Sequence, residues 1–167
     1  MTLHELNILP KHQLKSELFK CCGSTTWVDK MLPFFPADDL VELLNDAEEE
    51  WYHCTEADWL EAFAQHPKIG DIASLQKKFA DTAEWAGGEQ MAVGTATQQT
   101  IEALANANDA YEQKFGFIFI VCATGKSADE MLQLLQARLP NNKQEEIKIA
   151  MDEQNKITQL RLQKLLA

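Results

Sequence analysis

Apolar residues recur at intervals of three and four along most of the chain, which is the spacing of one face of an α-helix. After Pro10 the sequence places Leu14, Leu18, Cys21 and Cys22 at such positions. Proline suits the first position of a helix, because the N–H group that it lacks would have no partner there. The pattern therefore predicts a helix that opens with Pro10.

The same spacing predicts helices over residues 37–52, 55–66, 95–114, 131–139 and 145–166, with a short helical stretch near 72–79. Thr55 stands before an acidic first turn, as a capping residue does. Ser127 and Glu130 have the spacing of a capping box. Pro67 ends the helix before it, because the residue that precedes a proline is pushed out of the α region. Glycines indicate an irregular middle section, at Gly70, Gly87, Gly88 and Gly94.

Residues 117–122 are the one stretch with β character. Six apolar residues do not distinguish a strand from the start of a buried helix. Since the sequence offers no second strand to pair with them, we expect a short buried extended connector. The predicted fold is all-α, a single-domain helical bundle over residues 1–167.

The charge of the chain limits its partners. Its 167 residues include 26 acidic and 15 basic ones, which gives a formal net charge of −11. Proteins that bind nucleic acids or anionic membranes use clustered Lys and Arg, so this balance argues against both partners. No apolar run approaches the roughly 18–20 residues that span a bilayer. The sequence also shows neither a secretory signal nor a peroxisomal address, so we expect a cytoplasmic protein.

The four cysteines have no spacing typical of a metal site. Cys21 and Cys22 are adjacent, and Cys54 follows His53 directly. Neighbouring residues on a helix point in different directions, whereas zinc needs its ligands to converge. We therefore interpret the cysteines, including Cys122, as free thiols that are at least partly buried, and we expect no metal.

The first candidate for chemistry is His66. Pro67 holds it in an extended conformation at a helix end, and Gly70 permits a tight turn shortly after. Presented in this way, a histidine can transfer protons near neutral pH. The alternative is that His66 only caps the last carbonyl groups of its helix.

The second candidate is the segment Ala86-Gly87-Gly88-Glu89-Gln90. Its two glycines allow the backbone to approach a ligand closely, and Glu89 and Gln90 supply a carboxylate and a neutral amide. The alternative is a flexible loop that leads into a helix.

The third candidate is Arg161, which lies between two leucines on the last predicted helix. A guanidinium can hold a carboxylate through two parallel hydrogen bonds. Alternatively, Arg161 is a surface side chain whose stem covers apolar residues. The chain contains no nucleophile elbow, P-loop or dinucleotide motif. Spacing alone thus indicates a helical domain with a possible His, Glu and Arg site.

Three elements taken together resemble 2-oxo-4-hydroxy-4-carboxy-5-ureidoimidazoline decarboxylase, a family of urate breakdown. They are His66-Pro67-Lys68-Ile69-Gly70, Gly88-Glu89-Gln90 and the stretch from Tyr111 through Phe115-Gly116-Phe117 to Cys122. The resemblance extends from Trp27-Val28 to Leu160-Arg161-Leu162 and so covers nearly the whole chain.

The resemblance implies an all-α protein, usually a homodimer, that decarboxylates a small ureidoimidazoline to (S)-allantoin without a cofactor. It places the catalytic roles on His66, as proton donor, and on Glu89, as the partner that orients it. It places substrate binding on Pro67, Ala86, Gly87, Gly88, Glu89, Gln90, Phe119, Ile120, Val121, Cys122, Ala123 and Arg161. Ala86 departs from the serine found in many members, so this chain has no hydroxyl at that position.

An interpretation from another class keeps the fold without the chemistry. In it the chain is an acidic helical interaction module, and His66 is a structural helix cap. A catalytic role requires His66, Glu89 and Arg161, which are far apart in sequence, to meet at one site. An interaction module has no such requirement.

Overall fold

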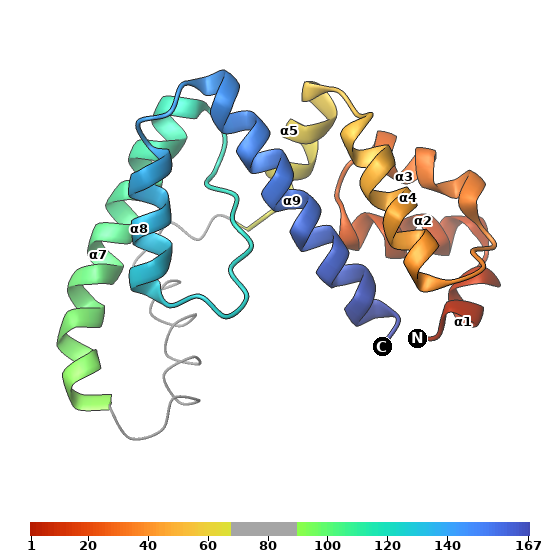
Figure 1. The fold of residues 1–167 in the computed structure, drawn as a ribbon, viewed down its shortest axis with the longest axis horizontal. Coiled ribbons are helices and arrows are strands. Elements are labelled where there is room, and N and C mark those ends of the chain that lie inside the picture. Colours follow the sequence, from red (N-terminus) through yellow and green to blue (C-terminus); the bar gives the residue numbers. More distant parts are fainter. Residues whose placement is uncertain (68–89) are drawn as a thin grey trace. The chain divides into compact units, whose positions relative to one another are not determined.

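The computed structural model describes residues 1–67 and 90–167, with side chains described in 1–67 and 98–167. In these parts of the chain all regular secondary structure is helical, as predicted. The helices, labelled in Figure 1, are α1 (Leu3–Asn7), α2 (Lys11–Cys21), α3 (Thr25–Met31), the 3-10 turn η1 (Leu32–Phe34), α4 (Leu40–Tyr52), α5 (Glu56–Ala64), α7 (Gln90–Phe115), α8 (Ala128–Arg138) and α9 (Lys143–Leu165). The helical stretch expected near 72–79 lies outside the described residues.

The starts of α2 and α4 differ from the sequence prediction. Pro10 is the N-cap of α2 and not its first helical residue. Helix α4 begins at Leu40 and not at 37, because the carboxylate of Asp39 accepts a hydrogen bond from the Glu42 N–H at 2.8 Å and caps the helix there. Ala37 is held outside the helix, since its N–H donates to Oδ1 of Asn7 at 2.8 Å.

Helix α7 begins five residues before the predicted start and contains Gly94, which we expected in an irregular section. A glycine inside a helix costs only about 1 kcal/mol relative to alanine, so a long helix tolerates it. At the other end Gly116 has φ +80°, a left-handed conformation suited to glycine, and its N–H donates to the Glu112 carbonyl at 2.8 Å.

The apolar stretch 117–122 is an extended connector without strand pairing, as predicted. Phe117, Ile120 and Cys122 are buried, and the residues between them are half-buried. After the connector, Ser127 caps α8 by accepting from the Glu130 N–H at 3.2 Å. The serine half of the predicted capping box is therefore present.

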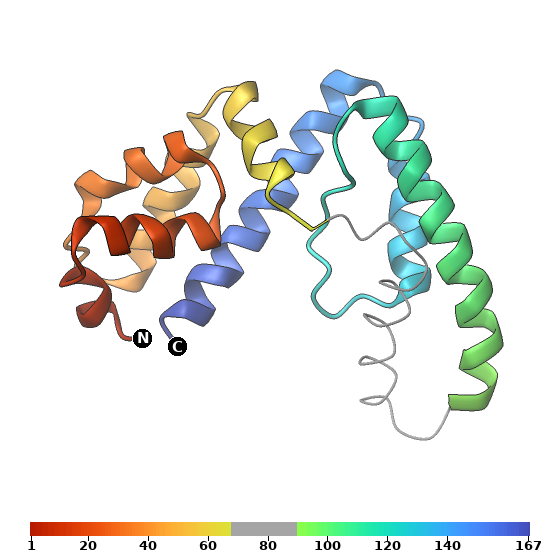
Figure 2. The ribbon, with the colours of Figure 1, turned by 180° about the vertical axis from the view of Figure 1, so that it is seen from behind.

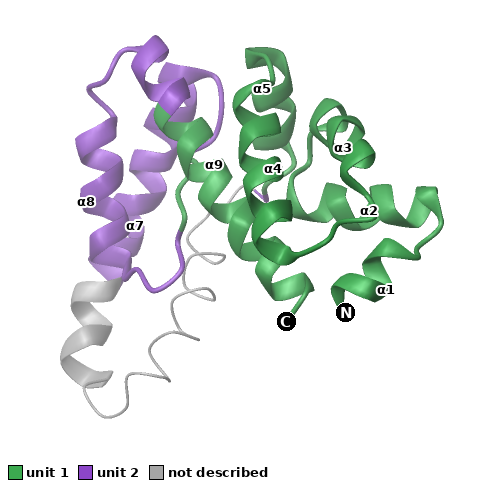
Figure 3. Ribbon diagram, turned by 45° about the vertical axis from the view of Figure 1, so that its right-hand side comes forward, with its two compact units in different colours: residues 1–66, 120–122, 149–167 green, residues 67–119, 123–148 purple. Residues whose placement is uncertain are grey.

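The chain forms two compact units that alternate along the sequence (Figure 3). Unit 1 comprises residues 1–66, 120–122 and 149–167, and unit 2 comprises 67–119 and 123–148. Helix α9 begins in unit 2 and continues in unit 1. In unit 2, α7 and α8 lie side by side in both views (Figure 1, Figure 2).

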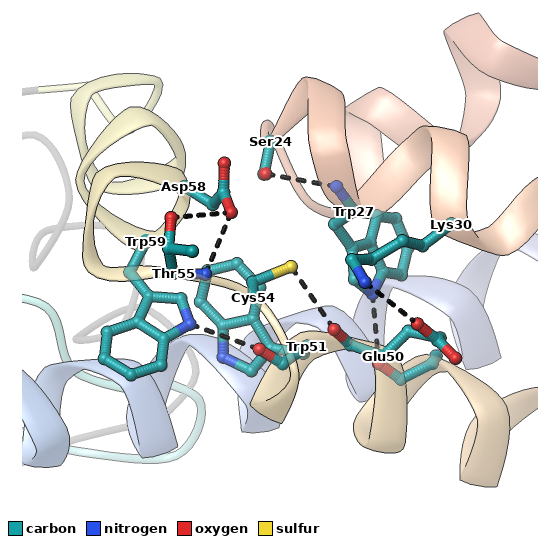
Figure 4. Close-up of polar contacts among 10 residues, drawn as sticks. Ser24, Trp27, Lys30, Glu50, Trp51, Cys54, Thr55, Asp58 and Trp59 are labelled. Carbon is teal, nitrogen blue, oxygen red and sulfur yellow. Dashed lines mark hydrogen bonds and ion pairs between the residues drawn. The ribbon is translucent and has the colours of Figure 1, made fainter.

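Three tryptophans, labelled in Figure 4, join helices of unit 1 through hydrogen bonds of their indole N–H groups. The indole N–H of Trp27 donates to the Ala47 carbonyl at 3.0 Å and joins α3 to α4. The indole of Trp51 donates to the Met151 carbonyl of α9 at 2.9 Å, and that of Trp59, on α5, donates to the Trp51 carbonyl at 3.1 Å. Buried indoles need such partners, so these bonds fix α5 and α9 relative to the end of α4.

Candidate functional site

His66 follows the C-terminal end of α5. Its N–H donates to the Phe63 carbonyl at 3.2 Å and so extends the last turn of the helix by one bond. Phe63 is 1% exposed and anchors this turn in the core of unit 1. The imidazole ring, which is half-buried, is thus carried by a well-packed helix end.

Gly23, between α2 and α3, packs directly against this helix end. A β-carbon built at position 23 would lie 2.7 Å from Cβ of Gln65 and still closer to its Cγ. Real β-carbons do not come so near, so any side chain at this position would displace Gln65 or the loop. Since Gln65 precedes His66, the missing side chain of Gly23 contributes to the placement of the histidine.

The imidazole of His66 is hydrogen-bonded to a side chain of α9. Its Nε2 lies 2.5 Å from Oε1 of Gln154, and the amide nitrogen of Gln154 donates to Oγ1 of Thr158 at 3.1 Å. Gln154 is fully buried and Thr158 is 2% exposed. The ring therefore contacts a buried polar side chain and does not serve as a cap of α5.

The surroundings lower the pKa of His66 below its ordinary value of 6.5. Burial is the main cause, because it disfavours the charged imidazolium. The positive charge of Arg161 acts in the same direction, while the hydrogen bond to Gln154 opposes both. Together these surroundings favour the neutral form of the imidazole.

Arg161 is a half-buried residue of α9, and its side chain contacts the C-terminal end of α2. Its Nη1 donates to the Lys20 carbonyl at 3.2 Å. The last carbonyls of a helix carry partial negative charge, so a cation is favourable here. Among the described side chains and backbone this is the one hydrogen bond of the guanidinium, which has further N–H groups that can hold an anion.

The other predicted substrate-binding residues are placed less completely. Residues Ala86, Gly87, Gly88 and Glu89 lie outside the described residues. Gln90 is the first residue of α7. Pro67 is exposed and follows His66 directly.

The predicted segment 119–123 divides between the two units. Ile120, Val121 and Cys122 belong to unit 1, whereas Phe119 and Ala123 belong to unit 2. Cys122 is close enough to Lys156 of α9 to influence its pKa. The ring of Phe119 lies 4.5 Å from the guanidinium carbon of Arg138.

Arg138 is part of a buried ionic cluster in unit 2. It contacts Oε1 of Glu146 through Nε and Nη2, both at 2.6 Å. The Tyr111 hydroxyl donates to the same oxygen at 2.6 Å, and the Asn141 amide donates to Oε2 at 3.0 Å. Glu146 is fully buried, so this cluster compensates a charge that would otherwise be costly in the core.

Sequence reasoning missed Gln154 and Thr158. Both lie on the same face of α9 as Arg161, at the intervals of four and three that bring helix side chains together. A signal for them was present in the sequence, because both are polar residues at positions where the helical pattern predicts apolar ones. The functional meaning of that signal depends on their sharing a helix face with Arg161.

All four cysteines are free and buried, in agreement with the prediction. Burial raises the pKa of the Cys21 and Cys54 thiols to about 11 and that of Cys22 to about 12. These thiols are therefore protonated at neutral pH and poor nucleophiles. No cluster of three or more metal-ligating side chains occurs among the described residues. In the same part of the chain, none of the helices has the length and apolar character to cross a membrane.

Solved structures share this helical fold. A crystal structure of OHCU decarboxylase in the presence of (S)-allantoin is 36% identical, covers 90% of this chain and 96% of its own, and superimposes with a TM-score of 0.71. A crystal structure of (S)-allantoin synthase, 16% identical, covers 98% of this chain and 54% of its own with a TM-score of 0.70, and supports the fold alone.

Sequence comparison identifies the family. Residues 7–163 match the family described as OHCU decarboxylase, and the chain belongs to this family. It is 39% identical to the uric acid degradation bifunctional protein TTL of Arabidopsis thaliana over 88% of this chain and 45% of that protein. It is 25% identical to the 2-oxo-4-hydroxy-4-carboxy-5-ureidoimidazoline decarboxylase of Halalkalicoccus jeotgali over 99% of this chain and 92% of that protein. The chain thus spans less than half the length of the Arabidopsis thaliana relative but nearly all of the Halalkalicoccus jeotgali one.

Proposed function

We propose that the protein is a carboxy-lyase that converts 2-oxo-4-hydroxy-4-carboxy-5-ureidoimidazoline to (S)-allantoin. Family membership supports the reaction. The observation that carries the proposal is a half-buried histidine that is hydrogen-bonded to the buried side chain of Gln154 and whose pKa is lowered by burial and by the charge of Arg161. A histidine able to move protons beside an arginine able to hold an anion is what this reaction requires.

The substrate itself can accept the electrons that decarboxylation releases. Its carboxylate is attached to a ring carbon that also carries a hydroxyl and adjoins a C=N bond. When the bond to the carboxylate breaks, CO₂ leaves and the electron pair moves toward the ring nitrogen. Once this nitrogen has taken up a proton from water, the intermediate is a neutral enol. The ring itself accepts the electrons, so the chemistry supports the expectation that no cofactor or metal takes part.

The remaining steps move one proton from oxygen to carbon. The enol hydroxyl must lose a proton, and the neighbouring carbon, which bears the ureido group, must gain one. His66 in its neutral form can accept the first proton and return it to the carbon. The proton that the ring nitrogen takes up comes from water, so the loss of CO₂ from the carboxylate consumes one solvent proton overall. General acid–base catalysis of this kind contributes roughly 10²- to 10⁴-fold.

Arg161 is the proposed ligand for an anionic oxygen of the substrate. Since the chain has a net charge of −11, local positive charge has to favour the binding of an anion. We propose Glu89 as the partner that orients His66, and Gln90 with the backbone of 119–123 as ligands of the ureido and ring amides. Pro67 and residues 86–88 complete the proposed binding segments.

Homodimerisation and a cytoplasmic location remain predictions from the sequence and its resemblance. Light scattering of the purified protein tests the first, and fractionation of the source cells tests the second. Treatment with EDTA, followed by metal analysis of the active protein, tests the expected independence of metals.

Circular dichroism on freshly generated substrate tests the proposed activity. Uncatalysed decarboxylation in water adds the proton to both faces of the enol equally and gives racemic allantoin. The protein should instead produce an optically active solution of one sign. His66→Gln should lower the rate by about 10²- to 10⁴-fold with the fold retained.

His12→Gln is the matched control, because His12 is an exposed histidine on α2. It should leave the rate unchanged. Racemic product from the wild-type protein would contradict the proposal and return the chain to the interaction-module interpretation. Full activity of His66→Gln would remove His66 from the reaction.

A further inference from the structure

The side-chain amide of Gln154 has both of its ends engaged. The nitrogen end donates to Thr158 at 3.1 Å, and the oxygen end faces Nε2 of His66 at 2.5 Å. Thr158 in turn lies close enough to the buried thiol of Cys22 to lower its pKa. The amide is therefore oriented by a buried chain of polar groups that leads from His66 into the core of unit 1.

This orientation determines which nitrogen of His66 carries the proton. A carboxamide oxygen accepts hydrogen bonds and cannot donate them. If Nε2 were unprotonated, its lone pair would face the lone pairs of Oε1 at a position that is fully buried on the side of Gln154. An unsatisfied buried polar pair of this kind is costly, so the tautomer with the proton on Nε2 is favoured.

We propose that Gln154 is a positioning residue that holds His66 in the Nε2–H tautomer and leaves Nδ1 as the nitrogen that exchanges protons with the substrate. The inference rests on the proposed function for its catalytic part. Its structural part, the tautomer, stands independently of any activity. Within the described residues the hydrogen bond found for the imidazole is the one at Nε2, which is consistent with Nδ1 serving the reaction.

Gln154 also acts on the protonation of His66. The hydrogen bond raises the pKa of the ring, whereas burial and the charge of Arg161 lower it. Arg161, on the same helix, is the charged side chain that acts on the ring among the described residues. Gln154 thus both orients the ring and limits the loss of basicity that burial causes.

Nitrogen NMR of protein labelled with ¹⁵N-histidine tests the tautomer directly. The signals of His66 are identified by their absence in His66→Gln. In the wild-type protein above pH 7, the cross-peak pattern should be that of the Nε2–H tautomer. In Gln154→Met, which keeps the length of the side chain but has no amide, the pattern should change to a mixture of both tautomers.

Kinetics with three variants test the effect on catalysis. Gln154→Met should lower kcat by roughly 10- to 100-fold, the usual effect of losing a partner that orients a functional histidine, with a KM close to that of the wild type. Gln154→Glu keeps an acceptor opposite Nε2 and should restore most of kcat. Because its carboxylate favours the imidazolium, it should also shift the acid limb of the pH profile upward.

Asn155→Leu is the matched control for the loss of a buried amide on α9. Asn155 is 7% exposed and donates to Glu48 at 3.3 Å, so its contacts differ from those of Gln154. It should lower stability without altering the tautomer, kcat or the pH profile.

Two results would overturn the inference. One is an Nδ1–H pattern for wild-type His66, and the other is an unchanged pattern and unchanged kcat in folded Gln154→Met. If the wild-type protein proves inactive but shows the Nε2–H tautomer that Gln154→Met loses, the proposed function fails and the positioning of His66 by Gln154 stands.

Discussion

Gly23 and Gln65 approach so closely that no side chain fits between them, since a β-carbon at position 23 would lie 2.7 Å from Cβ of Gln65. Gln65 is the C-cap of α5 and precedes the proposed catalytic histidine. A loop between α2 and α3 therefore sets the position of a residue more than forty positions further along the chain.

Gly23→Ala should destabilise the protein and disturb the site. Overpacking of this kind typically costs about 1–3 kcal/mol, because the neighbours have to shift. The shift falls on the turn that carries His66, so kcat should decrease together with the thermal midpoint. Thermal unfolding and steady-state kinetics measure the two effects.

The double variant Gly23→Ala with Gln65→Gly is the control for this prediction. Gln65 has helical dihedral angles that glycine also adopts, so the exchange transfers the β-carbon from one partner to the other. It should recover part of both the stability and the kcat that Gly23→Ala loses. If Gly23→Ala alone proved as stable and as active as the wild type, the loop would accommodate the added β-carbon without cost and the prediction would be wrong.

Arg161→Lys and Arg161→Ala should weaken catalysis in that order. A lysine keeps the charge but loses the planar fork that holds a carboxylate through two bonds. Alanine should cost a few kcal/mol in kcat/KM if the ion pair is desolvated. It should also destabilise the fold by about 0.5–1 kcal/mol, because the bond to the Lys20 carbonyl at the end of α2 is lost.

Removal of the guanidinium has a second consequence, for pH dependence. Arg161 lowers the pKa of His66, so Arg161→Ala should raise that pKa and move the acid limb of the kcat profile upward. Equal activity and identical pH profiles in wild type and both variants would identify Arg161 as a helix-end contact only.

The pKa of His66 also predicts how stability depends on pH. In the unfolded chain His66 titrates near its ordinary value of 6.5, and in the folded protein it titrates lower. Below the unfolded value the unfolded chain binds more protons, so the free energy of unfolding decreases as pH falls. The contribution that neutral His66 makes to the free energy of unfolding is fully present above pH 6.5. It is lost as the pH falls from that value toward the pKa of His66 in the folded protein.

Urea unfolding between about pH 7.5 and pH 5 tests this linkage. The difference in unfolding free energy between wild type and His66→Gln should change with pH, in favour of the variant at the acid end. A constant difference would contradict the lowered pKa.

Glu146→Gln should be strongly destabilising. The carboxylate is fully buried and contacts Arg138 at 2.6 Å, so its neutralisation deprives a buried guanidinium of this countercharge. Breaking one side of a buried ion pair costs about 3–5 kcal/mol. Glu145→Gln makes the same chemical change at an exposed position one residue earlier and should have little effect. Urea unfolding of both variants gives the comparison, and equal stabilities would mean that the pair contributes nothing.

Local features of the sequence predicted most of the helices. The acidic residue after Thr55, the capping Ser127 and the proline after His66 act within one turn, so their consequences are visible without the fold. The predicted start of α4 at residue 37 was wrong, because Asn7, thirty positions earlier, binds the backbone of Ala37 outside the helix.

The sequence likewise predicted the part of the candidate site that depends on local signals. His66 stood out because the proline beside it marks a helix end. The role of Gln154 depends on a partner 88 positions away. Its place on the apolar face of α9 indicates a buried polar side chain but does not reveal that partner.

The alternation of the two units has a consequence for the order in which the protein can fold during synthesis. The indole of Trp51 finds its carbonyl partner in Met151, one hundred positions later, and unit 1 contains residues 149–167. A nascent chain that has completed α5 therefore still lacks the α9 partner of Trp51. Unit 1 can complete its core only after residues 149–167 have been synthesised, so the N-terminal helices expose apolar surface until then.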